Sequence, residues 1–304
     1  MKKETSWKKF WRKTFQIVLI LGSIVLIERF CYMQTAGFRL AKIQPDRSFY
    51  SDKRLPSSFA QDRETLQLLD QPFFFLGSGV QSYAFISEDE KIVLKFFKHY
   101  HSFPSTAFLE KLPLPSPLDR LRKKVLLNRE TRMNHIFKSC EIAFNELPKE
   151  TGVIYIHLRP TSRLNKDVHI FDKLGIHHSI DLDSIPFVLQ IKAELIYPKL
   201  QKLLKQNDQS GAKRCIDSIL DRIVGRCQKG IVNSDPIIRR NFGFIGEEAV
   251  EIDIGSFNEN PFVKKPYSLK KELFFETLEL KQWLEQNNLE LATYLDEKIN
   301  VLLG

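Results

Sequence analysis

The chain has 304 residues, of which 43% are hydrophobic and 27% charged, so it can fold as one large globular domain or two smaller ones. Residues 1–54 hold 12 Lys and Arg against 4 Asp and Glu, and the other residues hold 34 against 33. A nucleic-acid-binding protein would carry its basic patch on the folded part, so we expect a membrane surface as partner and no nucleic acid. The four cysteines are dispersed, which argues against a zinc site.

The N-terminal segment combines basic, aromatic and apolar residues. Residues 1–13 contain six basic side chains and two tryptophans, and residues 15–27 carry no charge. A membrane-spanning helix needs about 20 apolar residues, which aromatic residues on both sides of the uncharged run could complete. We therefore expect residues 1–33 to be a membrane anchor, spanning or held in the inner leaflet, that contacts the membrane through residues 7–33. A signal peptide and a buried core helix are the alternatives.

The rest of the chain is predicted to be α+β, with strands first and helices later. After a juxtamembrane linker at residues 34–70, FFFLG, SYAFIS and IVLKFF are expected to form a three-stranded antiparallel meander. A long helix is expected over 118–147, followed by further strands and then helices. This order predicts a two-lobed fold, with an N-terminal lobe at 71–193 and a helical C-terminal lobe at 194–304. Beyond the long helix, strands are expected at 152–158, 168–174, 187–193 and 250–255. Helices are expected at 195–206, 211–230, 268–286 and 288–303.

Gly77 and Gly79 lie at the first bend of the meander, on either side of Ser78. Glycines at a hairpin tip are common for backbone reasons alone. The alternative is that the backbone is bare so that a phosphate can approach it. Because a second strand follows the bend, a flap over a nucleotide is favoured over a dinucleotide-binding turn, which opens a helix.

Polar residues further along the chain could complete such a site. Lys95 lies within the apolar strand IVLKFF and either points to solvent or reaches phosphate oxygens. Asp235 and Asn241 follow an amphipathic helix, and Asp253 follows a short strand. Carboxylate and amide oxygens are ligands that suit Mg²⁺, although Asp and Asn are also ordinary turn residues.

In this order the motifs resemble those of the protein-kinase-like fold, in the broad sense that includes aminoglycoside and lipopolysaccharide kinases. GSGVQSYAF resembles the glycine-rich loop, VLK the strand-three lysine, NSD with the later asparagine the catalytic loop, and DIG the metal-binding D-F-G element. The apolar N-terminus together with these segments is similar to an uncharacterised family of bacterial membrane-associated kinase-like proteins. The kinase resemblance covers about residues 70–304.

The resemblance implies ATP and Mg²⁺ as cofactors, and a role for each matching residue. A lysine of this kind is expected to pair with a glutamate on the long helix, for which Glu141 is preferred and Glu130 is the rival. The phosphates would be covered by Gly77, Ser78 and Gly79 and held by Lys95; the acceptor hydroxyl would be oriented by Asp235; and Mg²⁺ would be bound by Asn241 and Asp253.

The chain also departs from the kinase pattern. Ser82 replaces the third glycine, Asn233 and Ser234 replace the His-Arg pair, and Asp235 and Asn241 are six residues apart where kinases show five. Only 51 residues follow Asp253, without an A-P-E motif, so a small or lipid-like acceptor is expected.

Two functional hypotheses follow: a membrane-associated phosphotransferase, or a pseudokinase that binds nucleotide or a partner without catalysis. If the anchor spans with its basic end inside, the folded part lies outside, away from ATP, which would favour the pseudokinase. Arg239 and Arg240 could contact an acidic substrate or lie on a solvated turn. The seven histidines are expected to be surface or strand residues.

Overall fold

The computed structural model describes residues 2–45, 63–99, 113 and 115–303. Residues 46–62 of the predicted linker and residues 100–112 of the predicted N-terminal lobe lie outside this part. The helices are α1 (Lys2–Thr35), α2 (Leu40–Ile43), α3 (Arg63–Gln67), α5 (Ser116–Glu146), α6 (Pro148–Thr151), α7 (Ile196–Lys205), α8 (Gln209–Gln228), α9 (Ile238–Asn241), the 3₁₀ helix η2 (Pro261–Lys264), α10 (Pro266–Asn287) and α11 (Leu289–Leu303). The strands are β1 (Phe73–Ser78), β2 (Ser82–Ser87), β3 (Ile92–Phe97), β4 (Val153–His157), β5 (Asp167–Phe171), β6 (His177–Asp181), β7 (Phe187–Ile191), β8 (Glu194–Leu195), β9 (Ile231–Asn233), β10 (Phe242–Ile245), β11 (Glu248–Glu251) and β12 (Phe257–Glu259).

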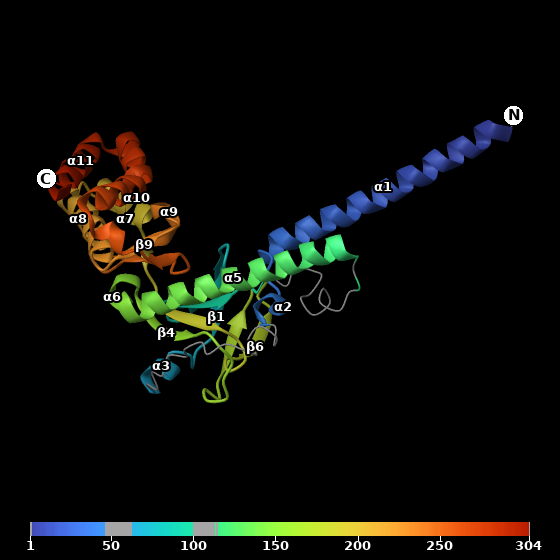
Figure 1. The fold of residues 1–304 in the computed structure, drawn as a ribbon, viewed down its shortest axis with the longest axis horizontal. Coiled ribbons are helices and arrows are strands. Elements are labelled where there is room, and N and C mark those ends of the chain that lie inside the picture. Colours follow the sequence, from blue (N-terminus) through green and yellow to red (C-terminus); the bar gives the residue numbers. More distant parts are fainter. Residues whose placement is uncertain (1, 46–62, 100–112, 114, 304) are drawn as a thin grey trace.

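The fold is mixed α+β, as predicted, with a sheet half (63–99 and 115–191) and a helical half (194–303), which lies above and to the left of the sheet in Figure 1. In the described residues, a seven-stranded sheet has the order β4-β7-β3-β2-β1-β5-β6. The predicted antiparallel meander β1-β2-β3 is confirmed. The sequence analysis missed β6, a strand with one buried hydrophobic residue, Ile180, which pairs with β5 at the edge of the sheet.

The strands of the meander place alternate side chains on opposite faces of the sheet. Leu94 and Phe96 of β3 belong to a core on one face, which also contains Tyr83 and Phe85 of β2. Lys95, between Leu94 and Phe96, points to the other face, as Phe97 does; Phe97 packs against α5 with its ring 5.2 Å from that of Phe137. Of the two alternatives for Lys95, the one in which it points to solvent is therefore wrong.

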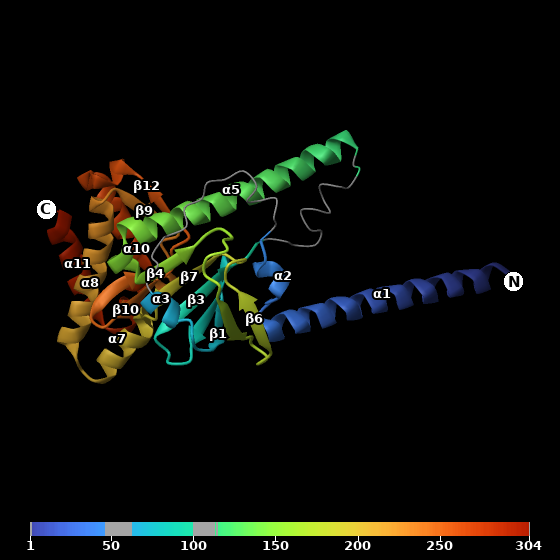
Figure 2. The ribbon, with the colours of Figure 1, turned by 90° about the horizontal axis from the view of Figure 1, so that it is seen from below.

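Helix α5 lies across the sheet and extends well beyond it (Figures 1 and 2). Its second part packs into a core that contains residues of both halves. In this core Phe137 and Cys140 of α5 join Ile231, Ile254 and Phe257 of the helical half. The long helix predicted at 118–147 is therefore confirmed, and it connects the two halves.

The helical half has a separate core around α8. Its buried residues Ile216, Ile219, Leu220 and Ile223 recur at helical spacing, as predicted for 211–230. Helices α10 and α11 pack against α8, and two small sheets, β11-β10-β8 and β12-β9, complete this half. The loops of these small sheets carry the predicted acidic residues.

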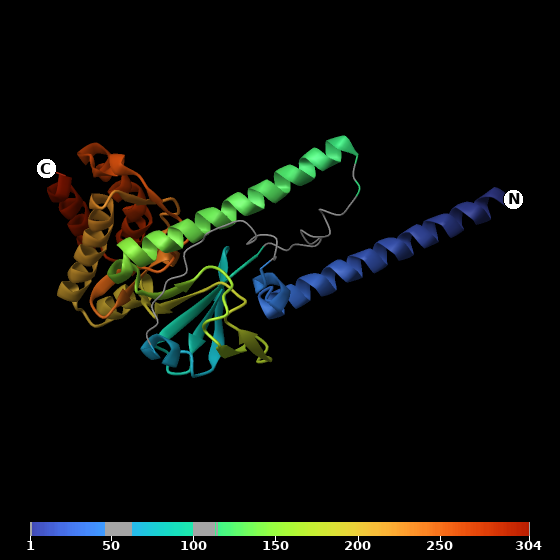
Figure 3. The same cartoon turned by 60° about the horizontal axis from the view of Figure 1, so that its bottom comes forward.

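Helix α1 projects away from the body of the protein (Figures 1 and 3). Among the described residues, one helical segment, Phe10–Thr35, is long enough and apolar enough to cross a membrane. None of its residues is buried. Its 26 residues would extend about 39 Å, more than the roughly 30 Å of a bilayer core. The alternative of a buried core helix is therefore wrong. The alternative of a signal peptide stays open, because a signal sequence passes the same test of length and composition.

The chain that follows α1 is part of the fold. The helix ends at Thr35, and Gly37, two residues later, has a φ of +69° that suits glycine. Phe38 and Ile43 are then buried in the core of the sheet, and the Tyr83 hydroxyl donates to the Gly37 carbonyl. The start of the predicted linker therefore ties α1 to the strand that follows the glycine bend.

Candidate functional site

The glycines at the β1–β2 bend do not need a left-handed backbone, although Gly77 lies where a β-bulge shifts the register between the two strands. Neither Gly77 nor Gly79 has a positive φ. A Cβ atom at Gly77 would meet nothing within 4 Å, and one at Gly79 would make an ordinary contact with the Ser82 carbonyl at 3.7 Å. A side chain would therefore fit at both positions, and the choice between an ordinary hairpin tip and a bend kept bare for a ligand stays a prediction.

Lys98, directly after β3, is hydrogen-bonded to this bend. Its Nζ donates to Ser78 Oγ at 2.7 Å and to the Gly79 carbonyl at 2.5 Å, and it lies 4.3 Å from the centre of the Tyr83 ring. Burial and the nearby Lys42 lower the pKa of Lys98 to about 8. The sequence analysis missed this residue, although it lies three positions after Lys95.

Lys95 reaches across to the helical half. Its Nζ donates to the Ile252 carbonyl at 2.5 Å, although the two residues are 157 positions apart. Burial lowers the pKa of Lys95, while Asp253 and Cys140 act in the opposite direction. The lysine therefore lies beside the residue that the sequence analysis predicted as a metal ligand.

The expected partner of Lys95 on α5 is not in contact with it. Among the described residues, Lys95 forms an ion pair with neither Glu141 nor Glu130. Glu141 is half-buried, its Oε1 has no hydrogen-bond partner in this part of the chain, and burial raises its pKa against the effect of Lys138. The α5 residue that affects the pKa of Lys95 is Cys140, one position earlier, or about 100° around the helix, and burial raises the pKa of its own thiol. The choice between the two glutamates stays a prediction.

The predicted catalytic loop is held together by two asparagines. Asn233 Oδ1 accepts from the backbone N–H of Asp235 at 3.0 Å, and its Nδ2 donates to Glu251 at 3.0 Å. Asn241 Nδ2 donates to the Asp235 carbonyl at 2.6 Å. The six-residue spacing is accommodated because one helical turn, α9, ends at Asn241. Asn233 thus positions the loop from the place where kinases have the His-Arg pair.

Asp253 begins the turn that follows β11. Its Oδ1 accepts from the Gly255 N–H at 3.2 Å, which leaves Oδ2 without a hydrogen bond in the described structure. The side chain of Ser139 on α5 donates to the Ile254 carbonyl and accepts from the Phe257 N–H, both at 2.6 Å. Helix α5 therefore fixes the path of this turn.

The tip of the glycine hairpin touches the same turn. A Cβ atom at Gly255 would lie 1.7 Å from Oε1 of Gln81, so glycine allows the Gln81 side chain to rest on the backbone there. A pocket of about 400 Å³ adjoins this contact and is lined by residues of α5, including His135 and Ile136. The predicted glycine loop, Lys95 and Asp253 thus lie at one junction of the two halves.

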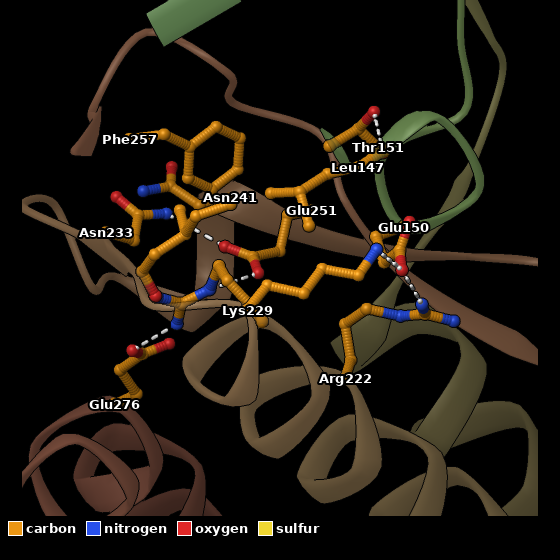
Figure 4. A network of polar contacts seen from close by, with 12 residues as sticks. Leu147, Glu150, Thr151, Arg222, Lys229, Asn233, Asn241, Glu251, Phe257 and Glu276 are labelled. Carbon is orange, nitrogen blue, oxygen red and sulfur yellow. Dashed lines mark hydrogen bonds and ion pairs between the residues drawn. The ribbon is translucent and has the colours of Figure 1, made fainter. Parts of the chain in front are cut away.

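A buried charge cluster contacts the predicted catalytic loop (Figure 4). Arg226 donates to Glu251 at 2.7 Å and to Glu276 at 2.5 Å, and all three side chains are at most 1% exposed. Glu251 also accepts from Asn233, as Figure 4 shows, so the cluster reaches the loop that carries Asp235. The sequence analysis missed it, because charged residues are usually exposed.

The possible metal ligands form a small set. In the part of the chain that the structure describes, no group of three or more His, Cys, Asp and Glu side chains could hold a metal ion. Asn241 and Asp253 together offer an amide oxygen and a carboxylate oxygen. Mg²⁺ bound by one or two protein oxygens usually takes waters and substrate phosphates as its other ligands.

No protein-family model and no curated protein matches the chain. Among solved structures, one of the bifunctional kinase-methyltransferase WbdD is 14% identical with a TM-score of 0.34, over 72% of this chain and 42% of that chain. A co-crystal structure of WbdD with a kinase inhibitor is 16% identical with a TM-score of 0.36, over 74% and 45%. The chain therefore spans less than half the length of the WbdD chains that it matches, and a similarity of this extent does not assign a function to it.

Proposed function

We propose that the chain is a membrane-associated protein with a two-lobed, kinase-like fold that binds ATP with Mg²⁺ where its sheet and helical halves meet. It transfers the γ-phosphate to a hydroxyl group of a small molecule. The carrying observation is the position of Lys95 beside Asp253, with its ammonium on the Ile252 carbonyl. In phosphoryl transfer of this kind, a lysine contacts the phosphates and an aspartate across the junction binds the metal ion.

The oxygen atoms at the junction fit Mg²⁺. Asn241 uses its Nδ2 for the Asp235 carbonyl, and in the described structure neither its Oδ1 nor Oδ2 of Asp253 accepts a hydrogen bond, so both oxygens would be available to a cation. Two hard oxygen ligands match the usual protein share of a magnesium site on a nucleotide. Asp235, held by Asn233 and Asn241, is the residue that would orient the acceptor hydroxyl.

The glycine bend provides the third element. Gly77 and Gly79 leave room for phosphate oxygens at the backbone, and Ser78 adds a hydroxyl donor. Lys98 places a second ammonium at this bend, which raises the local positive potential. Because Gln81 rests on Gly255, the tip of the hairpin must lift when a nucleotide enters.

One observation favours the pseudokinase as a second candidate. Lys95 is bound to a backbone carbonyl, and in the described residues no carboxylate of α5 pairs with it. An active kinase needs that ion pair in place. A protein that keeps this arrangement would bind nucleotide without turnover and act through a partner.

Nucleotide binding by the full chain in non-ionic detergent micelles tests the proposal. ATP with Mg²⁺ should raise the melting temperature, and the rise should be lost in Lys95→Met and should no longer depend on Mg²⁺ in Asp253→Asn. Lys91→Met, an exposed lysine in the β2–β3 turn, is the matched control and should respond like the wild type. Melting without nucleotide shows that each variant is folded.

The two candidates are separated by turnover. With a small hydroxyl compound present, Asp235→Asn should lower ATP consumption by about 10²-fold or more while nucleotide binding is kept. Binding without turnover in the wild type would leave the pseudokinase. No response of the wild type to ATP, or an equal response in Lys95→Met, would show that the junction is not a nucleotide site.

A further inference from the structure

A second pocket adjoins the catalytic loop on the helical half. Its volume is about 930 Å³, and it lies between the first turn of α7, the turn α9 and helix α10. One of its walls is Ile237, two residues after Asp235. Small-molecule sites have volumes of about 300–1,000 Å³, so this pocket has room for a compound of several carbon atoms.

Tyr197 lines this pocket, and its hydroxyl is buried and unsatisfied in the described structure. The residue is 8% exposed, and its hydroxyl is buried without a hydrogen-bond partner among the described residues. Its ring is held by Trp283, at a centroid distance of 5.0 Å, and by the guanidinium of Arg239, 5.7 Å from the ring centre. A buried hydroxyl without a partner is costly, so its presence beside a pocket indicates a ligand that accepts its hydrogen bond.

The charge at this pocket is positive. Arg239 and Arg240 both line it, and in the described part of the chain neither forms an ion pair. The acidic residue in its wall is Glu279, so the pocket carries a net charge of about +1. Helix α7 also begins here, and the N-terminus of a helix favours an anion. Arginine binds phosphate oxygens in a bidentate manner, which suits a phosphate group.

The remaining walls select for more than a phosphate. Leu195, Pro198 and Ile237 provide an apolar surface, and Glu279 can accept hydrogen bonds from hydroxyl groups. We propose that this pocket binds a small phosphorylated hydroxyl compound, such as a sugar phosphate, through Arg239, Arg240 and Tyr197. That this compound is also the acceptor rests on the proposed function, because the pocket begins beside the loop that carries Asp235.

The position of the pocket favours a soluble compound over a lipid head group. Leu195, Tyr197 and Arg240 belong to the helical half, whereas α1 projects from the opposite side of the protein (Figure 1). If α1 lies in a membrane, the helical half points away from it. A phospholipid head group carries the same phosphate chemistry, so the experiment includes it as a separate arm.

The fluorescence of Trp283, which contacts Tyr197, reports on binding to this pocket. We would use the full chain in non-ionic detergent micelles with Trp7→Phe and Trp11→Phe, without ATP or Mg²⁺. The probes are glucose 6-phosphate, ribose 5-phosphate and glycerol 3-phosphate, with glucose and inorganic phosphate for comparison. A saturable change is expected with at least one phosphorylated probe at millimolar concentration, and weaker or no change with glucose or inorganic phosphate.

Variants identify the residues that bind. Arg239→Gln with Arg240→Gln should weaken binding by about tenfold or more, and Tyr197→Phe, which keeps the ring, by about fivefold. Arg214→Gln removes an exposed arginine of α8 elsewhere on the helical half and should leave binding unchanged. Melting curves without probe show that the double variant is folded.

Several results would overturn the inference. These are no saturable change with any phosphorylated probe, equal affinity for inorganic phosphate, or unchanged affinity in the double arginine variant. Binding only to vesicles that contain phosphatidylglycerol would assign the pocket to a lipid head group instead. The binding assay contains no ATP, so the two proposals can fail separately. Binding of a sugar phosphate without a response to nucleotide would refute the proposed function and keep this inference. A response to nucleotide without binding of any phosphorylated probe would refute this inference and keep the proposed function.

Discussion

Replacing Glu276 by glutamine tests how charge is balanced in the buried cluster that contacts the predicted catalytic loop. Arg226 is the one cation of this cluster, and Glu251 and Glu276 are its two carboxyl groups. Both oxygens of Glu251 accept hydrogen bonds, whereas Oε2 of Glu276 has no partner in the described structure. Burial raises the pKa of Glu276 to about 8 against the opposing effect of Arg226. We therefore expect the proton to reside on Glu276 at neutral pH.

This pKa predicts the sign and size of a pH effect. In the unfolded chain, Glu276 ionises near its usual pKa of about 4.3. Between that value and the raised pKa, the folded state binds one more proton than the unfolded state. The free energy of unfolding therefore falls as pH rises, by about 1.4 kcal/mol per pH unit and about 5 kcal/mol over the whole window. Glu276→Gln is neutral at every pH, so it should remove this slope while its amide oxygen still accepts from Arg226.

Urea unfolding between about pH 5 and pH 7 measures the effect, with a wild-type fall of about 2.7 kcal/mol expected from this residue. The fluorescence of Trp283 follows the helical half when Trp7 and Trp11 are replaced by phenylalanine. Glu285→Gln, an exposed glutamate of the same helix, should keep the wild-type slope. A wild-type slope in Glu276→Gln would refute the reasoning, because another group would then bind the proton.

Two further predictions concern polar side chains that hold loops. Ser139→Ala removes the hydroxyl that bridges Ile254 and Phe257, so two buried backbone groups lose a partner; urea unfolding should show a loss of about 1–3 kcal/mol, and a change near zero would contradict this role. Burial opposes ionisation of Asp183, but the Thr161 hydroxyl and three backbone N–H groups outweigh it and lower its pKa to about 2. Its stabilising effect should therefore be present above about pH 4 and lost toward pH 2. In thermal melts, Asp183→Asn should reduce the fall in melting temperature over this pH range, and an unchanged fall would contradict the prediction.

Local patterns in the sequence were enough to predict most of the elements. The meander was predicted from short apolar runs bounded by glycines and a polar turn, and the helices α5 and α8 from patterns typical of helices, which each segment carries by itself. Helix α1 was predicted in the same way, from apolar length and flanking basic residues. Strand β6 was missed because Ile180 alone is a buried hydrophobic residue in it.

The pairing of these elements required the tertiary structure. Strand β7 lies beside β3, and β5 lies beside β1, although other strands are closer to each in sequence. A repeat along one strand states which face is apolar, but it does not state which strand is the neighbour. For the same reason, the sequence could not show that residues after α1 complete the core of the sheet.

The candidate site divides in the same manner. Gly77, Lys95 and Asp253 could be chosen from the sequence because their residue types and order suit phosphate and metal chemistry. The roles of Lys98, Asn233 and Tyr197 could not, because each depends on a partner that only folding brings near. The sequence states the type of each side chain. Its pKa, its burial and its hydrogen-bond partners depend on residues as many as 157 positions away, as between Lys95 and Ile252.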